Sequence, residues 1–384
     1  MKIDDKTSHN SPSIRFPEFT GEWVLNEMWN IAPLQRGFDL PSGNVLDGTI
    51  PVVYSNGILR YHNDYKCKAP AVITGRSGTI GKFTYLDKGY YWPHNTTLWV
   101  TDFCHNNPKF IYYLYQTINI SQFATGSGVP TLNRNDVHRH RCYLPKSIDE
   151  QRKIAAFLSL IDERIAIQDR LIDRLQSLMI GLNNSLYEQY GNDITTSFME
   201  LGYSYSGLSG KSAKDFGSGK PFITYLNVYS NIIVDETDYQ YVRINDGEKQ
   251  NIVRTGDVLF TLSSETPEEV GIGSVYLGEK EVYLNSFCFG IHIERNQLAY
   301  SPYLSYYVTS TAFRKFIYPF AQGSTRFNLC KADFEKASIK LPSLDNQKRI
   351  SAMLDCIAEK IQAEKAILEY YNIQRQYLLR QMFI

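Results

Sequence analysis

Polar and basic side chains gather in two stretches of the sequence that have the same layout. The first follows a Gly/Ser loop and contains Asn133, Arg134 and the run 138–141, His-Arg-His-Arg. The second runs from Gly323 to Asn328. Asn and Arg can each form two hydrogen bonds with a base edge, while Ser and Thr suit bases or phosphates. Both stretches therefore predict DNA contacts, with ordinary polar surface loops as the alternative.

A further loop in each half of the chain adds candidates of the same chemistry. Arg76, Ser77 and Lys82 follow one apolar run, and Ser263 and Ser264 follow another. The run 138–141 can be interpreted as a solvated basic edge or as a strip that faces phosphates. The complete set of candidate DNA-contacting residues is Arg76, Ser77, Lys82, Ser127, Thr131, Asn133, Arg134, Arg139, Ser263, Ser264, Ser324, Thr325, Arg326, Asn328 and Lys331.

Motifs of catalysis are missing from the sequence. The stretch 75–82 resembles a phosphate loop, but its spacing is one residue too long, and Phe83 replaces the magnesium-binding Ser or Thr. A strand, not a helix, is expected after it. The Asn/Asp-Pro-Pro-aromatic tetrapeptide of an amino-methyltransferase, G-x-S-x-G and H-E-x-x-H are all absent. The scattered cysteines predict reduced thiols and no metal site. We expect no catalytic residue in this chain.

The composition is that of a globular protein without net charge. Forty Lys and Arg balance forty Asp and Glu among 384 residues. This balance argues against a diffusely basic nucleic-acid binder, although local basic surfaces and partners that supply charge fit it. No apolar run reaches the ~18 residues of a membrane span, and the N-terminus lacks the apolar core of a signal peptide. We expect a cytoplasmic protein that begins with a disordered lead, residues 1–13.

Two heptad repeats must position the candidate loops. Residues 144–186 and 341–382 both open with Leu-Pro and continue to Gln-(Arg/Lys)-(Lys/Arg)-Ile. Apolar residues then recur at alternating spacings of four and three, which predicts a coiled-coil seam. Both seams break at the same step, at Gln168 and Glu364. The main seam positions are Ile154, Leu158, Ile161, Ile165, Ile172, Leu175, Ile350, Leu354, Ile357, Ile361 and Leu368.

The segments before the two heptad repeats also resemble one another. Residues 49–57 match 220–228, and 69–75 match 256–262. Residues 123–137 match 320–334 without a gap. Short β-like runs and a helix expected from Pro108 to Ile118 predict mixed α/β globules. The fold class is α+β: two similar mixed α/β domains separated by two long helices that form an antiparallel, pseudo-twofold coiled coil.

The expected boundaries follow from the repeats: globules at 14–145 and 190–342, a central spacer helix at 146–189 and a C-terminal spacer helix at 343–384. The first seam spans 33 residues, from Ile154 to Leu186, so its helix would extend about 50 Å at ~1.5 Å per residue. Two unequal globules at the ends of such a spacer could read two short DNA sequences separated by an unread gap.

The chain resembles the specificity subunit of a type I DNA restriction–modification enzyme. The resemblance rests on the duplicated openings around Gln151 and Gln347, on the Gly-Ser…Leu…Asp run before each, and on RFPEFTGEW at 15–23. It covers residues 14–384. It implies two target recognition domains on a bipartite duplex DNA site, two modification subunits docked on the helices, and restriction subunits that translocate and cleave. It also implies a non-catalytic chain that binds no cofactor, with S-adenosylmethionine, ATP and Mg²⁺ on partner subunits.

Two alternatives remain open at this point. The chain could serve a type IIB-like enzyme, in which one partner polypeptide both methylates and cuts DNA. It could also be a protein-interaction scaffold with a coiled coil and no DNA role. Matching base-compatible loops in both halves argue against the scaffold.

Overall fold

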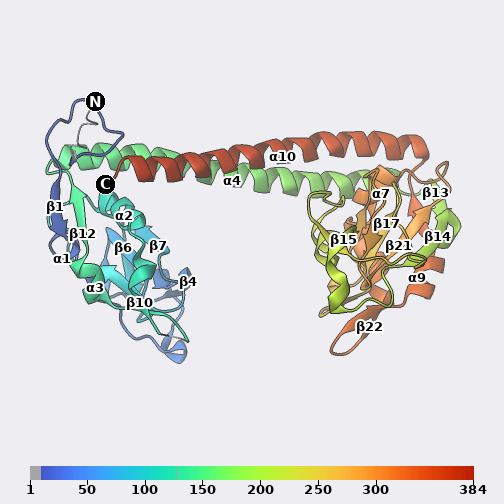
Figure 1. Cartoon of the computed structure of the whole chain (residues 1–384), viewed down its shortest axis with the longest axis horizontal. Coiled ribbons are helices and arrows are strands. Elements are labelled where there is room, and N and C mark those ends of the chain that lie inside the picture. The colour runs from blue at the N-terminus through green and yellow to red at the C-terminus, as the bar shows by residue number, and fades with distance from the viewer. Residues whose placement is uncertain (1–9, 127) are drawn as a thin grey trace. The chain divides into compact units, whose positions relative to one another are not determined.

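The computed structural model describes residues 10–126 and 128–384 and divides into two compact units. Unit 1 runs up to Asp169 and includes Ala366–Ile384, whereas unit 2 comprises Arg170–Lys365. Most of the expected lead, residues 1–9, and the candidate Ser127 lie outside the described residues. Both units mix helices and strands, which confirms the α+β fold class (Figure 1).

Unit 1 is built on two four-stranded sheets, ordered β2-β9-β6-β7 and β4-β3-β8-β5. The first sheet is antiparallel, whereas β3 and β8 pair in parallel in the second. Its strands are β1 (Val24–Glu27), β2 (Leu34–Arg36), β3 (Ile50–Tyr54), β4 (Gly57–His62), β5 (Cys67–Lys68), β6 (Ala71–Gly75), β7 (Phe83–Leu86), β8 (Tyr90–Pro93), β9 (Thr97–Val100), β10 (Ala124–Thr125), β11 (Thr131–Leu132) and β12 (Arg141–Leu144).

Helices α1 (Met28–Ile31), α2 (Pro108–Thr117) and α3 (Arg134–Arg139) complete the globular part of unit 1. The predicted helix at Pro108 is confirmed. It begins where expected because Asn107 caps it, accepting a hydrogen bond from the N–H of Phe110 at 2.9 Å, and Pro108 occupies its first position. Its buried face packs against the first sheet in the main core of the unit.

Unit 2 repeats this plan with different strand lengths. Its sheets are ordered β14-β21-β17-β19, β16-β15-β20 and β18-β23-β22. The strands are β13 (Ile194–Thr196), β14 (Gly202–Ser206), β15 (Phe216–Ile223), β16 (Tyr239–Val242), β17 (Val258–Thr261), β18 (Ser263–Ser264), β19 (Gly273–Val275), β20 (Tyr283–Leu284), β21 (Cys288–Ile293), β22 (Ala321–Gly323), β23 (Phe327–Leu329) and β24 (Ile339–Leu341). The short helices are α5 (Phe198–Leu201), α6 (Tyr225–Ser230), α7 (Ser301–Tyr307), α8 (Thr311–Ile317) and α9 (Lys331–Lys336).

The internal duplication is visible in the strand topology. In each unit an antiparallel pair, β1·β12 or β13·β24, joins the first strand to the strand before a long helix. The central sheet of unit 1, β2-β9-β6-β7, corresponds to β14-β21-β17-β19. The parallel pair β3·β8 corresponds to β15·β20. Both units therefore have the same architecture, as the sequence repeat indicated.

One segment of the sequence match is out of register by a residue. Matching 69–75 with 256–262 aligns Val72 with Leu259. Val72, however, belongs to the main core of unit 1, as Val258 does in unit 2, and Leu259 lies in a separate cluster. A one-residue shift exchanges the two faces of a strand. Ser77 pairs with Thr131 as Ser263 pairs with Asn328, so the structural match of Val72 is Val258, and β6 corresponds to β17 with this corrected register.

The two long helices are α4 (Ile148–Tyr190) and α10 (Leu344–Gln381). In unit 1, the start of α4 and the end of α10 share one core, which contains Leu158 and Leu378. In unit 2, the end of α4 and the start of α10 share another, which contains Leu186 and Leu354. Each unit thus pairs the beginning of one helix with the end of the other, which confirms the predicted antiparallel arrangement.

The predicted seam positions on both helices are buried or partly buried, and the predicted breaks are buried too. Ile154, Leu158, Ile350 and Leu354 are almost fully buried. Gln168 lies inside unit 1, and Glu364 lies inside unit 2, where its carboxylate pairs with Lys360 at 2.5 Å. A seam of this kind tolerates a buried polar residue when that residue is hydrogen-bonded.

Candidate nucleic-acid interface

Four loops of unit 1 meet at one edge of its central sheet. The loop after β6 pairs with the β10–β11 hairpin, because Ser77 forms a bridge with Thr131. It also contacts the β8–β9 loop, where Thr96 O accepts a hydrogen bond from the N–H of Arg76 at 2.7 Å. Lys82 Nζ donates to Asn56 O in the β3–β4 turn at 2.8 Å. We call these segments, 55–56, 76–82, 94–96, 126 and 128–135, the loop cluster of unit 1.

Glycines allow the loop after β6 to turn tightly. A Cβ atom at Gly75 would lie 1.8 Å from Thr79 O, and Gly78 has a φ of +79°, which favours glycine. The loop returns directly into β7, a strand. The glycines that resemble a phosphate loop therefore form a strand-to-strand turn, as expected.

The candidate side chains of this cluster differ in their exposure to solvent and in their interactions within the chain. Arg134 and Lys82 are exposed, while Arg76 and Ser77 are partly buried. Arg139 pairs with Asp136 at 3.3 Å on the surface. Asn133 caps α3 by accepting a hydrogen bond from the N–H of Asn135 at 3.1 Å. The hydroxyl of Thr131 lies 3.4 Å from Val129 O.

The basic run 138–141 does not form a continuous surface strip. His138 is buried, and its Nε2 accepts a hydrogen bond from the N–H of Leu34 at 2.8 Å. Burial and the nearby Arg134 lower the pKa of His138, which favours the neutral ring. Arg141 pairs with Glu27 at 3.2 Å on the adjacent strand. Neither sequence interpretation of the run holds for His138, because a side chain buried in this way reaches neither solvent nor phosphate.

Unit 2 builds a corresponding cluster around the sheet β18-β23-β22. Ser263 pairs with Asn328 across this sheet, just as Ser77 pairs with Thr131 in unit 1. Leu262 O accepts from the N–H of Leu329 at 2.8 Å. In each unit, β10 or β22 lies at the end away from the long helices (Figure 1).

Two candidates of unit 2 need correction as direct DNA contacts. Ser263 and Ser264 are buried, with 4% and 8% of their surface exposed. Ser264 Oγ donates to Glu269 Oε2 at 2.9 Å, and Ser263 O accepts from the hydroxyl of Tyr225. Their polar groups hold the sheet and its neighbouring loop together. Because this burial depends on the pairing of β18 with β23, the sequence pattern alone did not reveal it.

The exposed candidates of unit 2 lie on the β22–β23 hairpin and beside it. Ser324, Thr325, Arg326 and Asn328 are exposed. The guanidinium of Arg326 lies 5.8 Å from the ring centre of Phe287. Phe287 is itself exposed and was not among the candidates. An aromatic ring under an arginine keeps the guanidinium extended and ready to form hydrogen bonds.

The remaining candidate, Lys331, starts α9 and is partly buried. It pairs with Glu335 at 3.6 Å and lies over the ring of Phe289 at 4.9 Å. Sequence reasoning also missed Asn56 and Thr96, which join the loop cluster of unit 1 only through the fold. Their distance along the chain from the Gly/Ser loop gave no signal of this proximity.

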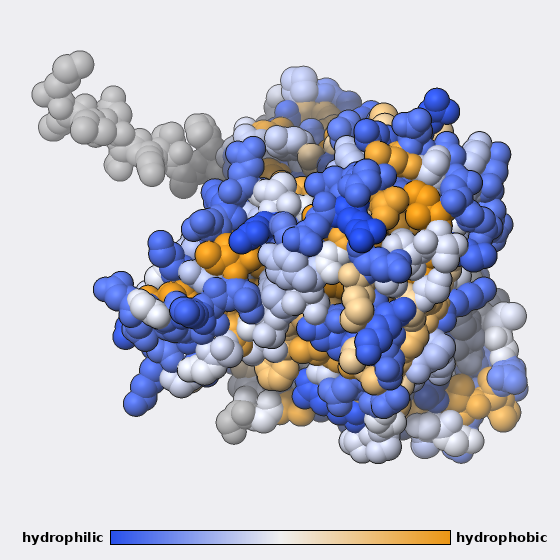
Figure 2. Space-filling model, turned by 90° about the vertical axis from the view of Figure 1, so that its right-hand side faces the viewer, coloured by the Kyte–Doolittle hydropathy of each residue, from blue (hydrophilic) through white to orange (hydrophobic). Residues whose placement is uncertain are grey.

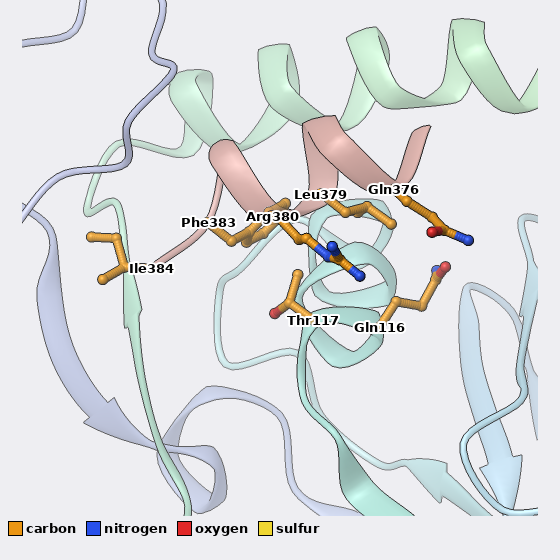
Figure 3. A pocket seen from close by; sticks show the side chains of 7 residues that line it. All are labelled: Gln116, Thr117, Gln376, Leu379, Arg380, Phe383 and Ile384. Carbon is orange, nitrogen blue, oxygen red and sulfur yellow. The ribbon is translucent and has the colours of Figure 1, made fainter. Parts of the chain in front are cut away.

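Each unit has a cavity beside the long helices. A cavity of about 410 Å³ in unit 1 is lined by Gln116 and Thr117 of α2, by Gln376, Leu379 and Arg380 of α10, and by Phe383 and Ile384 (Figure 3). A cavity of about 430 Å³ in unit 2 is lined by Met179, Tyr306 and neighbouring residues of α4, α7 and the loop at Ile232.

Within residues 10–126 and 128–384, no three His, Cys, Asp or Glu side chains come together as metal ligands would. Over the same residues, no helix combines the length and apolar character needed to cross a bilayer. Figure 2 shows mainly hydrophilic side chains on one face of unit 2, with small hydrophobic patches between them.

Solved structures share this fold. The crystal structure of the type I restriction–modification system S subunit from M. genitalium superposes with a TM-score of 0.58 at 16% identity, covering 97% of this chain and 99% of that one. A structure from work on complex assembly and conformational transition of the type I R-M system gives a TM-score of 0.57 at 16% identity, covering 93% and 96%. At this identity the similarity shows the two-domain fold with two long helices.

Sequence comparison agrees with the structural neighbours. The type I restriction enzyme StySPI specificity subunit of Salmonella potsdam is 27% identical over 150 residues, which cover 39% of this chain and 32% of that protein. The match therefore spans about a third of that relative. The family model of the type I restriction modification DNA specificity domain matches residues 27–177 and 208–370, more than half of the chain. The chain thus belongs to the family of type I restriction–modification DNA specificity proteins.

Proposed function

We propose that this chain is the sequence-specific DNA-binding subunit of a type I restriction–modification complex. It reads a bipartite duplex target and directs adenine methylation or cleavage by partner subunits. One observation carries the proposal: the corresponding loop clusters of the two units both carry hydrogen-bonding side chains, Arg76 and Arg134 in unit 1 and Arg326 and Asn328 in unit 2. These residue types read base edges and hold phosphates.

The proposed target recognition domains are residues 14–145 and 190–342, and the proposed spacers are 146–189 and 343–384. A spacer of two paired helices fixes the distance between the half-sites, because a helix resists bending and compression. The zero net charge supports a shared task, since a protein that binds DNA through phosphates alone is expected to be basic. Partner subunits then contribute part of the positive surface.

The long helices carry exposed apolar side chains that support docking of modification subunits. On α4 these include Leu160, Ile167 and Leu178, and on α10 they include Tyr370 and Ile373. Exposed apolar residues in such number mark interaction surfaces. In the proposed complex two modification subunits bind here, and restriction subunits complete the assembly. S-adenosylmethionine, ATP and Mg²⁺ belong to those partners, and this chain performs no catalysis.

Selection from a randomised duplex DNA library tests the proposal. The chain, purified with its methyltransferase partner, should enrich sequences with two fixed segments separated by a constant gap. Binding without any sequence preference would contradict DNA recognition and favour a scaffold. Identification of the co-purified partner separates the type I complex from a type IIB-like enzyme, because in the latter one polypeptide both methylates and cuts.

A further inference from the structure

We propose that Arg76 is the base-reading side chain of unit 1 and that its guanidinium binds a guanine in the major groove, while Lys82 of the same loop contacts the phosphate backbone. This inference rests on the proposed function, DNA recognition by the loop cluster of unit 1. It assigns a base contact to Arg76 and a phosphate contact to Lys82. It also implies that the two half-sites differ at the base pair that Arg76 reads.

The backbone on both sides of the Arg76 side chain is fixed. Its N–H donates to Thr96 O at 2.7 Å, and its C=O accepts from the N–H of Leu132 at 2.7 Å. These bonds tie Arg76 to the β8–β9 loop and to β11. A side chain that leaves a fixed backbone loses less conformational entropy on binding, so its hydrogen bonds discriminate more strongly between bases.

The guanidinium of Arg76 has no hydrogen-bond partner among the described residues. Four arginines among the described residues are partly buried: Arg15, Arg76, Arg314 and Arg375. Arg15 and Arg375 bind carboxylates, and Arg314 binds backbone carbonyls. Within residues 10–126 and 128–384, no hydrogen bond or ion pair satisfies Arg76. A guanidinium has five N–H donors, so a partly buried one without acceptors is suited to a ligand that supplies two acceptors side by side.

Unit 2 shows that the side chain at this position is free to vary. Leu262 O accepts from the N–H of Leu329 at 2.8 Å, as Arg76 O accepts from Leu132. The next residue also pairs alike in the two units: Ser263 pairs with Asn328 in unit 2, and Ser77 pairs with Thr131 in unit 1. Leu262 therefore occupies the place of Arg76. A contact to phosphate would serve both units alike, whereas a base-reading residue should differ between them, because leucine has no donor for guanine.

The chemistry of guanine fits the free guanidinium. Guanine presents the O6 and N7 acceptors side by side in the major groove, and arginine binds both at once. Lys82, at the end of the same loop, is exposed, and its ammonium donates to Asn56 O. A lysine acts as a point charge without the planar fork of arginine, which suits a phosphate. The pair thus combines one sequence-specific contact with one nonspecific contact.

The test compares Arg76→Gln, Arg76→Lys and Lys82→Gln with the unaltered chain, each purified with the methyltransferase partner, by selection from a randomised duplex library. Arg76→Gln should lose a guanine preference of about 5- to 150-fold at one position of one half-site, with the other half-site unchanged. Arg76→Lys keeps the charge but lacks the planar fork, so it should keep a weaker form of the same preference. Lys82→Gln should weaken binding to all sequences about equally and reduce its salt dependence.

The possible failures are distinguishable. If the unaltered complex selects no sequence, the proposed function fails. If it selects a bipartite site but Arg76→Gln weakens all sequences equally, Arg76 contacts phosphate and the inference is overturned while the function stands. Guanine preference retained in Arg76→Gln would also overturn it. If Arg76→Gln disturbs folding, selection of the whole half-site is lost, and Arg76→Lys then decides the question through the remaining positions of that half-site.

Discussion

Gln151 joins the start of α4 to Asn107, the residue that caps α2. Its Oε1 accepts a hydrogen bond from the N–H of Asn107 at 2.8 Å. Its Nε2 donates to Pro145 O at 3.0 Å and to Asn106 Oδ1 at 2.8 Å. One buried amide therefore closes the strand-to-helix turn and fixes the globule of unit 1 on its long helix.

Unit 2 contains the same joint. Gln347 Oε1 accepts from the N–H of Tyr300, the cap of α7, at 2.8 Å. Its Nε2 donates to Pro342 O at 2.9 Å and to Leu298 O at 2.8 Å. The repeated Leu-Pro…Gln opening thus encodes a hydrogen-bonded connection and not only a helix start.

Replacing Gln151 should destabilise unit 1 without altering unit 2. In Gln151→Ala the N–H of Asn107 and the C=O of Pro145 lose their buried partner, at a cost of about 1–3 kcal/mol for each group. Urea unfolding of the full chain measures the change. Gln189→Ala, at an exposed position of the same helix, is the matched control and should stay within about 0.5 kcal/mol. Equal stability of the two variants would show that the joint contributes nothing.

A second prediction concerns Arg314, which holds the loop beside the β22–β23 hairpin of unit 2. Its guanidinium donates to the carbonyls of Glu268, Val270 and Gly271 at 2.6–2.9 Å. Hydrogen bonds from a charged group contribute about 1.5–3 kcal/mol, so Arg314→Leu should loosen this loop. Hydrogen exchange of residues 265–272 should become faster, whereas exchange in unit 1 stays the same. Unchanged exchange in the loop would contradict the prediction.

Acid should destabilise unit 1 through His138. Burial and Arg134 hold the pKa of His138 below its ordinary value of 6.5, so the unfolded chain binds the proton more readily than the folded one. The stability of unit 1 is therefore complete above about pH 6.5 and decreases as the pH falls below that value. Thermal unfolding between pH 7.5 and 5 measures the slope.

His138→Gln isolates this contribution, because a glutamine oxygen can accept the hydrogen bond from Leu34. The variant should unfold with a shallower dependence on pH. His94 and His140 also have pKa values lowered by burial, so part of the slope should remain. His140→Gln is the matched comparison, since His140 is less buried. An unaltered slope in His138→Gln would remove the histidine from the explanation.

The long helices and the duplication were predictable because their signals are local or repeated. The alternating spacing around Leu158 and Leu354 requires only the helical period. Burial of Ser264 and His138 was not predictable, since it depends on strand pairs formed by distant residues. The equivalence of Arg76 with Leu262 was hidden by a one-residue shift in the sequence match, and strand pairing alone corrects it.

The final prediction concerns the proposed spacer. Gln176 and Met179 of α4 line the same cavity of unit 2 as Ile361 of α10, so the helices can be lengthened together at this level. Insertion of one heptad after Leu175 and another after Ile361 keeps the seam in phase and adds about 10 Å at ~1.5 Å per residue. At ~3.4 Å per base pair, the gap between the selected half-sites should lengthen by about three base pairs.

Selection from the randomised library measures this gap directly. An insertion of two residues in each helix is the comparison, because it turns the following seam residues by about 200° at ~3.6 residues per turn and should weaken bipartite selection without producing a new, longer gap. If the double heptad insertion selects both half-sites with the original gap, the helices do not set the spacing. If it selects them with a longer gap and unchanged bases, the spacer helices set the length of the gap, and the loop clusters independently set which bases are read.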